Sequence, residues 1–175
     1  SYLKAYTKEG LTMTYGNPEV SSSYIVPDEE LLLNLTTSYR MGWNLVEVSD
    51  ANGNYMKVDY MAMFSFGGGS MSRPALCEST IGRITYGGNK RKGSAGNVEV
   101  LFEYETRPDE QTSYVFGKRF RQWLRLKAIK TNVSSENQKE YRLSYDASSV
   151  VSRLQSVTLY DSENRKLLDP LIFKY

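Results

Sequence analysis

The chain has 175 residues, with 22 basic and 20 acidic side chains and a net charge of +2, which is too even for an electrostatically driven nucleic-acid or membrane-surface partner. Histidine is absent and Cys77 is the one cysteine, which excludes serine-histidine and cysteine-histidine catalysis, Cys/His zinc sites and an intrachain disulfide. The 14 tyrosines favour strands, so we expect one all-β domain over residues 1–175.

The sequence offers no membrane-spanning segment and no targeting segment. No stretch approaches the roughly 18 apolar residues of a membrane span. The first residues, SYLKAYTKEG, lack the apolar core of a signal peptide. We therefore expect that, if the protein is secreted or surface-exposed, its signal lies outside this sequence.

The first third of the chain predicts a hairpin and one ambiguous element. Residues 2–7 and 11–15 have strand character and reverse at Lys8-Glu9-Gly10. Further on, Pro27-Asp28-Glu29-Glu30 precedes LLLNL and could open a short helix, because Asp28 can cap the helix and the glutamates suit its first turn. An apolar strand is the alternative for this segment.

Residues 43–60, WNLVEVSDANGNYMKVDY, predict the clearest hairpin. Two segments of strand character flank Asp50-Ala51-Asn52-Gly53-Asn54, residues that tolerate the left-handed backbone of a tight reversal. After the turn, apolar residues alternate with Lys57 and Asp59, so we expect one apolar face on a strand that runs to about Phe66. Gly67 to Ser70 then predicts a flexible connection.

The remaining sequence predicts a succession of strands with short reversals. Strand patterns cover residues 78–86, 98–105, 114–121 and 124–128, separated by a basic loop at 87–93 and a polar segment at 106–113. Two further hairpins follow, with RLKAIKTN and KEYRLSYD around residues 133–138, and RLQSVTLY and KLLDPLIFKY around residues 161–164. The expected fold is an all-β antiparallel meander of about ten strands, forming a twisted sheet, a sandwich or a partly open barrel, with at most one short helix.

A degenerate repeat runs through these hairpins. Arg125-Leu126 and Arg153-Leu154 are each followed, three positions after the leucine, by a β-branched residue, and Val48 stands in the same place after Leu45. Strands that end in tyrosine follow, at Tyr60, Tyr145 and Tyr175. A repeat of roughly 18 to 23 residues with one hairpin per unit is typical of modular β architecture.

The repeat resembles known bacterial families. WNLVEV followed by DANGNYMKVDY is similar to the hairpin of Rhs and YD-repeat proteins, and RLQSVTLYDSENRKLL resembles it less closely. Residues 100–117, VLFEYETRPDEQTSYVFG, are similar to a segment of the Salmonella virulence-plasmid B-type proteins and of the B components of bacterial Tc toxin complexes. The last hairpin departs from the family pattern at Leu168-Asp169-Pro170-Leu171, and residues 62–79 have no clear counterpart.

The resemblance implies a non-enzymatic structural or interaction module, used as shell or scaffold in a secreted or surface bacterial protein. Its implied partners are other β-repeat domains of the same or a partner toxin-like protein. The alternative is a cell-surface domain that binds carbohydrate or another small ligand, because aromatic faces with polar edges, such as those of Trp43 and Trp123, suit sugars.

Other candidate sites have simpler structural interpretations. The Asp50 to Asn54 loop has carboxylate and amide oxygens of the kind that bind calcium. A twelve-residue calcium loop needs glycine in the sixth place and a carboxylate in the twelfth, whereas here glycine is in the fourth place and Met61 is in the twelfth, so we expect a turn. Glycine runs at residues 67–69 and 87–88 lack the Gly-Lys-Ser/Thr of a phosphate loop.

Charged clusters are also expected to be structural. A basic stretch interleaved with aromatic side chains could contact nucleic acid or an acidic partner, but a solvated strand face is favoured. The carboxylate pairs Asp109 and Glu110, or Glu103 and Glu105, could be imagined as catalytic, although acidic pairs on exposed strands are ordinary. We therefore expect no catalytic, cofactor-binding or metal-binding residue. The basic stretch comprises Lys118, Arg119, Arg121, Arg125 and Lys127, with Phe120 and Trp123 between them.

Overall fold

The computed structural model describes residues 2–17, 24–25, 41–66, 74–146 and 150–175. The described residues contain no helix and form twelve strands. The strands are β1 (Leu3–Tyr6), β2 (Thr12–Tyr15), β3 (Tyr24–Ile25), β4 (Gly42–Trp43), β5 (Leu45–Ser49), β6 (Asn54–Phe66), β7 (Pro74–Asn89), β8 (Val98–Val115), β9 (Lys118–Val133), β10 (Glu136–Tyr145), β11 (Leu154–Asp161) and β12 (Leu171–Ile172).

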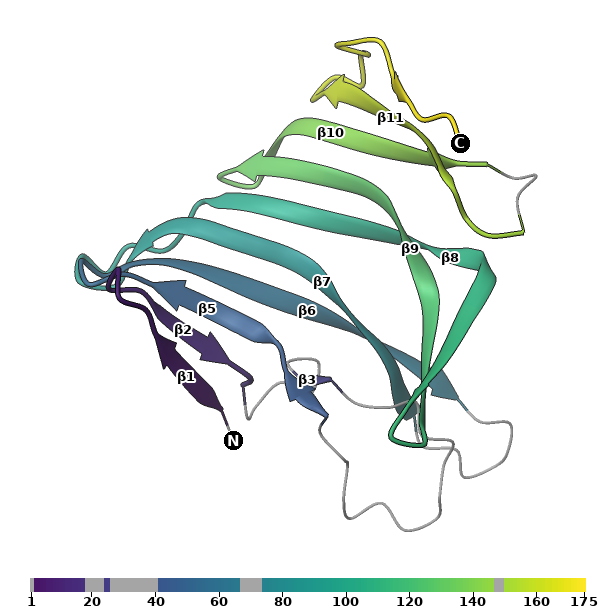
Figure 1. Cartoon of the computed structure of the whole chain (residues 1–175). Helices are drawn as coiled ribbons and strands as arrows, with labels where there is room; N and C mark the ends of the chain where they lie inside the picture. The colour runs from purple at the N-terminus through teal and green to yellow at the C-terminus, as the bar shows by residue number, and fades with distance from the viewer. Residues whose placement is uncertain (1, 18–23, 26–40, 67–73, 147–149) are drawn as a thin grey trace.

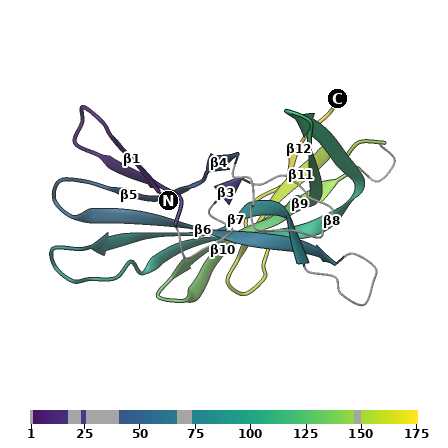
Figure 2. The same ribbon diagram turned by 90° about the horizontal axis from the view of Figure 1, so that it is seen from below.

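Ten strands form one antiparallel sheet in the order β1-β2-β5-β6-β7-β8-β9-β10-β11-β12, and β3 and β4 make a separate two-stranded sheet. The order follows the chain, so the meander expected from the hairpin pattern is confirmed. Figures 1 and 2 show a single curved layer that does not close into a barrel, with the N-terminus at one edge and the C-terminus at the other. The fold is therefore the twisted open sheet among the expected all-β forms.

The hairpin turns at Lys8-Glu9-Gly10, at residues 50–54 and at residues 161–164 form where the sequence predicts them. The 50–54 reversal closes with a bond from the Gly53 amide to the Asp50 carbonyl at 3.1 Å, and Gly53 has a φ of 89°. A Cβ at Gly53 would lie 2.8 Å from the Arg91 side chain, so glycine suits both the turn and the neighbouring loop. The predicted 133–138 turn is tighter than expected: β9 ends at Val133, β10 begins at Glu136, and the reversal is made by Ser134 and Ser135, which have φ values of 50° and 69°.

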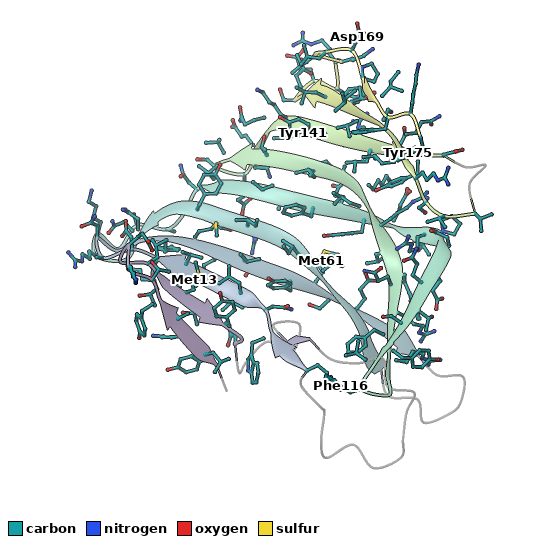
Figure 3. The ribbon with its side chains drawn as sticks, viewed as in Figure 1. Met13, Met61, Phe116, Tyr141, Asp169 and Tyr175 are labelled. Atoms are coloured by element: carbon teal, nitrogen blue, oxygen red, sulfur yellow. The ribbon has the colours of Figure 1, made fainter. Side chains whose placement is uncertain are left out.

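The prediction for residues 106–121 is wrong. The polar segment does not interrupt the strand, since β8 continues to Val115 and the chain reverses at Phe116 and Gly117, both with positive φ. Polar side chains are tolerated here because the backbone of residues 111–115 pairs with β9, while residues 107–110 are left out of the ladder as an irregularity. Figure 3 places Phe116 at the tip of this long β8–β9 hairpin.

Two other expectations change, and two lie outside the described residues. Trp43 is in β4, opposite Tyr24, and the hairpin strand begins at Leu45. Between them, the Asn44 carbonyl accepts the Gly16 amide at 2.8 Å. Strand β12 covers only Leu171–Ile172 of the KLLDPLIFKY segment, since Pro170 has no amide proton for the ladder. The possible helix after Pro27 and the connection at residues 67–70 lie outside the described residues.

The two faces of the large sheet differ in chemistry. Cross-strand register places Val58, Ile84 and Val100 in one apolar row, and a second row holds Phe102, Ile129, Tyr141 and Leu159. The opposite face carries cross-strand ion pairs, such as Arg83–Asp59 and Lys130–Glu103. Among the strand residues whose side chains are described, which leave out residues 24–25, 62–66, 74–77 and 118, the buried apolar side chains are Val58 and Ala128, at 6% and 1% exposure. The ladder is thus extensive while little apolar surface is enclosed.

Candidate functional site

The repeated feature of the sheet is a bulged junction between two kinds of strand. We define the tyrosine strands as those that carry Tyr15, Tyr60, Tyr104 and Tyr145, and the leucine strands as those that carry Leu45, Ile81, Leu126 and Leu154. At each junction one residue of the leucine strand is extra, which shifts the register by one position. The junctions pair Tyr15 with Leu45, Tyr60 with Ile81, Tyr104 with Leu126 and Tyr145 with Leu154.

Tyrosine hydroxyls bond the same leucine-strand carbonyls from the other side. The hydroxyl of Tyr104 donates to the Ile81 carbonyl at 2.9 Å, and that of Tyr145 donates to the Leu126 carbonyl at 2.5 Å. Tyr60 to Leu45 and Tyr175 to Leu154, both at 3.0 Å, are the equivalent bonds. Because a bulge disrupts the ladder locally, these hydroxyls supply the bulge carbonyls with a side-chain donor. Burial raises the pKa of Tyr60, Tyr104 and Tyr145.

The junction register explains why the sequence repeat has its spacing. The β-branched residue three positions after the leucine pairs with the residue two positions before the tyrosine, on the apolar face. These pairs are Met13–Val48, Val58–Ile84, Phe102–Ile129 and Leu143–Val157. The arginine before the leucine stacks on the following tyrosine, with the guanidinium of Arg125 4.4 Å from the Tyr145 ring centre. The leucine, β-branched, tyrosine and arginine positions of the repeat therefore each have a defined partner on a neighbouring strand.

The polar face has its own pairs at the junctions. The residue two positions after the leucine meets the residue just before the tyrosine. Arg83 and Asp59 form an ion pair at 2.9 Å in this position, and Ser144 and Ser156 share a hydrogen bond at 2.7 Å. The other two pairs are Thr14–Glu47 and Glu103–Ala128.

Asp109 is the centre of a polar cluster that the sequence did not predict. Its carboxylate accepts two bonds from the Arg107 guanidinium, at 3.2 and 3.0 Å, and the Arg107 and Asp109 side chains are 12% and 11% exposed. Ser152 donates to Asp109 through its amide at 2.7 Å and through its hydroxyl. These bonds, led by Arg107, hold the pKa of Asp109 well below its ordinary value. The cluster ties the irregular part of β8 to the segment before β11.

Replacing Asp109 by asparagine is expected to lower stability in a pH-dependent way. Since the pKa of Asp109 is lower in the folded chain than its ordinary 3.8, its contribution is complete above that pH and is lost as the pH falls below it. The difference in unfolding midpoint between wild type and Asp109→Asn should therefore be largest near neutral pH and shrink in acid, as measured by urea denaturation. Asp169→Asn, which removes a fully exposed carboxylate, should have little effect at any pH; a constant difference for Asp109→Asn would contradict the assignment.

The Asp50 loop is a turn in the structure. One carboxylate oxygen of Asp50 accepts the amides of Asn52 and Asn54 at 2.9 Å, and the other accepts the Asn54 side chain at 2.7 Å. These bonds lower the pKa of Asp50. Asp161 caps the later hairpin in the same way. The described residues hold no group of three or more Cys, Asp and Glu side chains that could bind a metal ion.

The other predicted candidates have structural contacts. Glu103 pairs with Lys130 and Glu105 pairs with Arg125, while Glu110 lies 3.7 Å from Arg121. In the basic stretch, the Arg121 guanidinium lies 4.4 Å from the ring centre of Trp123. Gly88 lies under the Tyr55 ring in β7, a site where a Cβ would clash. The glycine run at 67–69 lies outside the described residues.

Contacts between distant strands were missed by sequence reasoning. The Glu78 carboxylate accepts the amides of Trp123 and Leu124, at 2.8 and 3.1 Å, and so links β7 to β9 past the end of the β8 pairing. A lone glutamate in a strand carries no signal for such a contact. The indole nitrogens of Trp43 and Trp123 are both buried, so neither indole N–H is presented to a ligand.

Two of the shallow grooves on the described part of the sheet have volumes of several hundred Å³. One, of about 510 Å³, lies over β1, β2, β5 and β6, and its lining includes Tyr2, Lys4, Lys57 and Tyr60. The other, of about 460 Å³, lies over Ala128 and is lined by the Glu103, Glu140 and Arg142 side chains among others. Since the described residues contain no helix, none of them forms a helix that could cross a membrane.

No protein-family model matches the chain, and no curated protein is significantly similar to it in sequence. Solved structures do resemble it. The TcdB2-TccC3-Cdc42 crystal structure is similar over 99% of this chain, with a TM-score of 0.75 and 15% identity. The Photorhabdus luminescens Tc holotoxin pore carrying TccC3-D651A is similar over 99%, with a TM-score of 0.76 and 15% identity.

The N-terminal domain of the effector protein SpvB from Salmonella typhimurium strain LT2 is also similar, over 91% of this chain, with a TM-score of 0.69 and 12% identity. The chain covers 10% of each of the two Tc structures and 61% of the SpvB domain. At these identities the likeness concerns the fold. The chain therefore shares an open, Tc-toxin-like β fold with segments of these larger proteins.

Proposed function

We propose that the chain is a non-enzymatic structural module, a piece of shell or scaffold in a secreted or surface bacterial protein of the Rhs, YD-repeat or Tc-toxin type. The observation that carries the proposal is the imbalance between extensive strand pairing and little enclosed apolar surface. Outside residues 62–66 and 74–77, whose side chains are not described, the buried apolar side chains of the large sheet are Val58 and Ala128. A sheet of this width needs further layers or strands to cover its faces and edges.

Exposed apolar side chains support the same proposal. Phe116 at the β8–β9 tip is 91% exposed, and Leu171 and Ile172 of β12 are 62% and 63% exposed. Residues of these types stabilise a protein when they are removed from water, so they favour contacts with other β segments. The likeness to parts of much larger toxin structures agrees with a module that functions inside an assembly.

Cross-linking mass spectrometry in the bacterium that makes the protein tests the proposal. We expect cross-links from lysines of the sheet, such as Lys57, Lys127 and Lys139, to other β-repeat segments of the same or a partner protein. Recovery of the chain without such neighbours would contradict the scaffold function. So would turnover of a substrate that is abolished by changing one carboxylate, such as Glu103→Gln.

The groove beside Tyr2 and Tyr60 favours a second candidate, the binding of a carbohydrate or another small polar ligand. It combines tyrosine side chains with Lys4 and Lys57 in a space of about 510 Å³. A glycan array tests this candidate directly. Binding that is lost in Tyr2→Ala but kept in Tyr114→Ala would support it, and an array without saturable binding would remove it.

A further inference from the structure

We propose that the outer edge of β12 binds a leucine strand from another β-repeat segment, and that this strand carries an acidic residue two positions after its leucine. The inference rests on the proposed scaffold function, because it names the segment that the module contacts at one edge. It follows from the register of the junctions and from the charge at the edge.

Strand β12 and its continuation are built like the other tyrosine strands. We call the side of a tyrosine strand that faces the preceding leucine strand its inner side. There, the residue two positions after each leucine pairs with the residue three positions before the next tyrosine. This holds for Glu47–Lys57, Arg83–Leu101, Ala128–Arg142 and Ser156–Ile172. Tyr175 then bonds the Leu154 carbonyl in the same way as the earlier tyrosines bond theirs. Tyr175 lies at this outer edge of the sheet in Figure 3.

The outer side of this strand has no partner strand among the described residues. At the other tyrosine strands that side forms the bulged junction, in which an apolar residue two positions before the tyrosine meets a β-branched residue. Phe173 occupies this position and is 36% exposed. By continuity with the four junctions, Tyr175 would face the leucine of the added strand and Phe173 its β-branched residue.

Charge selects among possible leucine strands. Lys174, which is exposed, occupies the position just before the tyrosine, where Asp59 meets Arg83 in an ion pair. An incoming strand that has glutamate or aspartate two positions after its leucine would place that carboxylate opposite Lys174. The sequence of β5 has this chemistry, with Leu45, Glu47 and Val48 in the required places. Main-chain pairing provides the affinity and these side chains provide the specificity.

A fluorescein-labelled peptide that copies residues 43–50, WNLVEVSD, tests the proposal by fluorescence anisotropy with the full chain. We expect saturable binding with a Kd between about 10 µM and 1 mM, as for a single added strand. Phe173→Asp should weaken binding at least about tenfold, because it removes the apolar cross-strand pair. Tyr114→Asp, at the distant β8–β9 hairpin, is the matched control and should leave binding unchanged.

A charge exchange separates this site from non-specific association. The Lys174→Glu variant should bind the wild-type peptide roughly threefold more weakly than the wild-type chain does. A peptide that carries Glu47→Lys should restore the affinity of the Lys174→Glu variant. Amide chemical-shift changes should map to residues 171–175. Three results would each overturn the proposal. The first is binding that does not saturate up to 1 mM peptide, and the second is unchanged binding by a Phe173→Asp variant whose Tm equals that of wild type. The third is a set of chemical-shift changes confined to β2 and β6, which would mean that the peptide replaces β5. Such failures would leave the cross-linking test of the scaffold function standing.

Discussion

Replacing Tyr104 and Tyr145 together by phenylalanine is expected to lower the free energy of unfolding by about 2–4 kcal/mol, because each change leaves a bulge carbonyl without its side-chain donor. The two hydroxyls bond the Ile81 and Leu126 carbonyls at 2.9 and 2.5 Å, in half-buried surroundings. For a chain of this length the Tm should fall by roughly 5–15 °C. Thermal and urea denaturation followed by circular dichroism measure the loss.

The control for this double variant is Tyr114→Phe. Tyr114 is 69% exposed near the β8–β9 tip, so loss of its hydroxyl should change the Tm by little. The two single variants are also informative, because Tyr104 pairs with Leu126 while Tyr145 bonds the carbonyl of that leucine. We expect their effects to be coupled rather than additive. A double variant as stable as wild type would show that the hydroxyl bonds are replaced by water without cost.

Replacing Val58 by aspartate is expected to destabilise the chain by about 3 kcal/mol or more, because it places a carboxylate at a site that is 6% exposed. Val58 pairs with Ile84 in an apolar row, so the new charge would have apolar cross-strand neighbours. The loss should be smaller at acidic pH, where the carboxyl group becomes neutral. Urea denaturation at neutral and acidic pH gives the comparison.

Val150→Asp provides the matched control, since Val150 is 92% exposed and the same substitution there keeps its carboxylate in water. Its unfolding midpoint should stay close to that of wild type. If Val58→Asp and Val150→Asp were equally mild, the sheet would lack even the small enclosed core that the structure shows, and the Val58 row would have to be accessible to water in solution.

Much of the fold could be predicted because its signals are local. Alternation in residues 98–105 marks a strand whatever surrounds it, and Asp50 to Gly53 favours a reversal through side-chain to backbone bonds made within a few residues. Short reversals in succession then imply neighbouring strands, which is why the antiparallel order was correct. The polar segment at 106–113 misled the prediction, because backbone pairing with β9 does not require apolar side chains.

The candidate site was less predictable, because its contacts join strands that are far apart in the sequence. The spacing of leucine, β-branched residue and tyrosine was visible, but the reason for it was not. A bulge exists only relative to a partner strand, so the hydroxyl bond from Tyr104 to Ile81 and the pairing of Tyr104 with Leu126 depend on the tertiary register. The Asp109–Ser152 contact across the sheet likewise leaves no local trace.

By itself, the sequence determined the all-β class, the hairpin order, the capped turns at Asp50 and Asp161, and the absence of histidine and disulfide chemistry, because these depend on composition or on neighbours in the chain. Only the tertiary structure decided that the sheet stays open, that its bulges recur in one register and that β12 presents a matching edge. Closure and register depend on the twist and pairing of whole strands, and alternation along one strand cannot specify them.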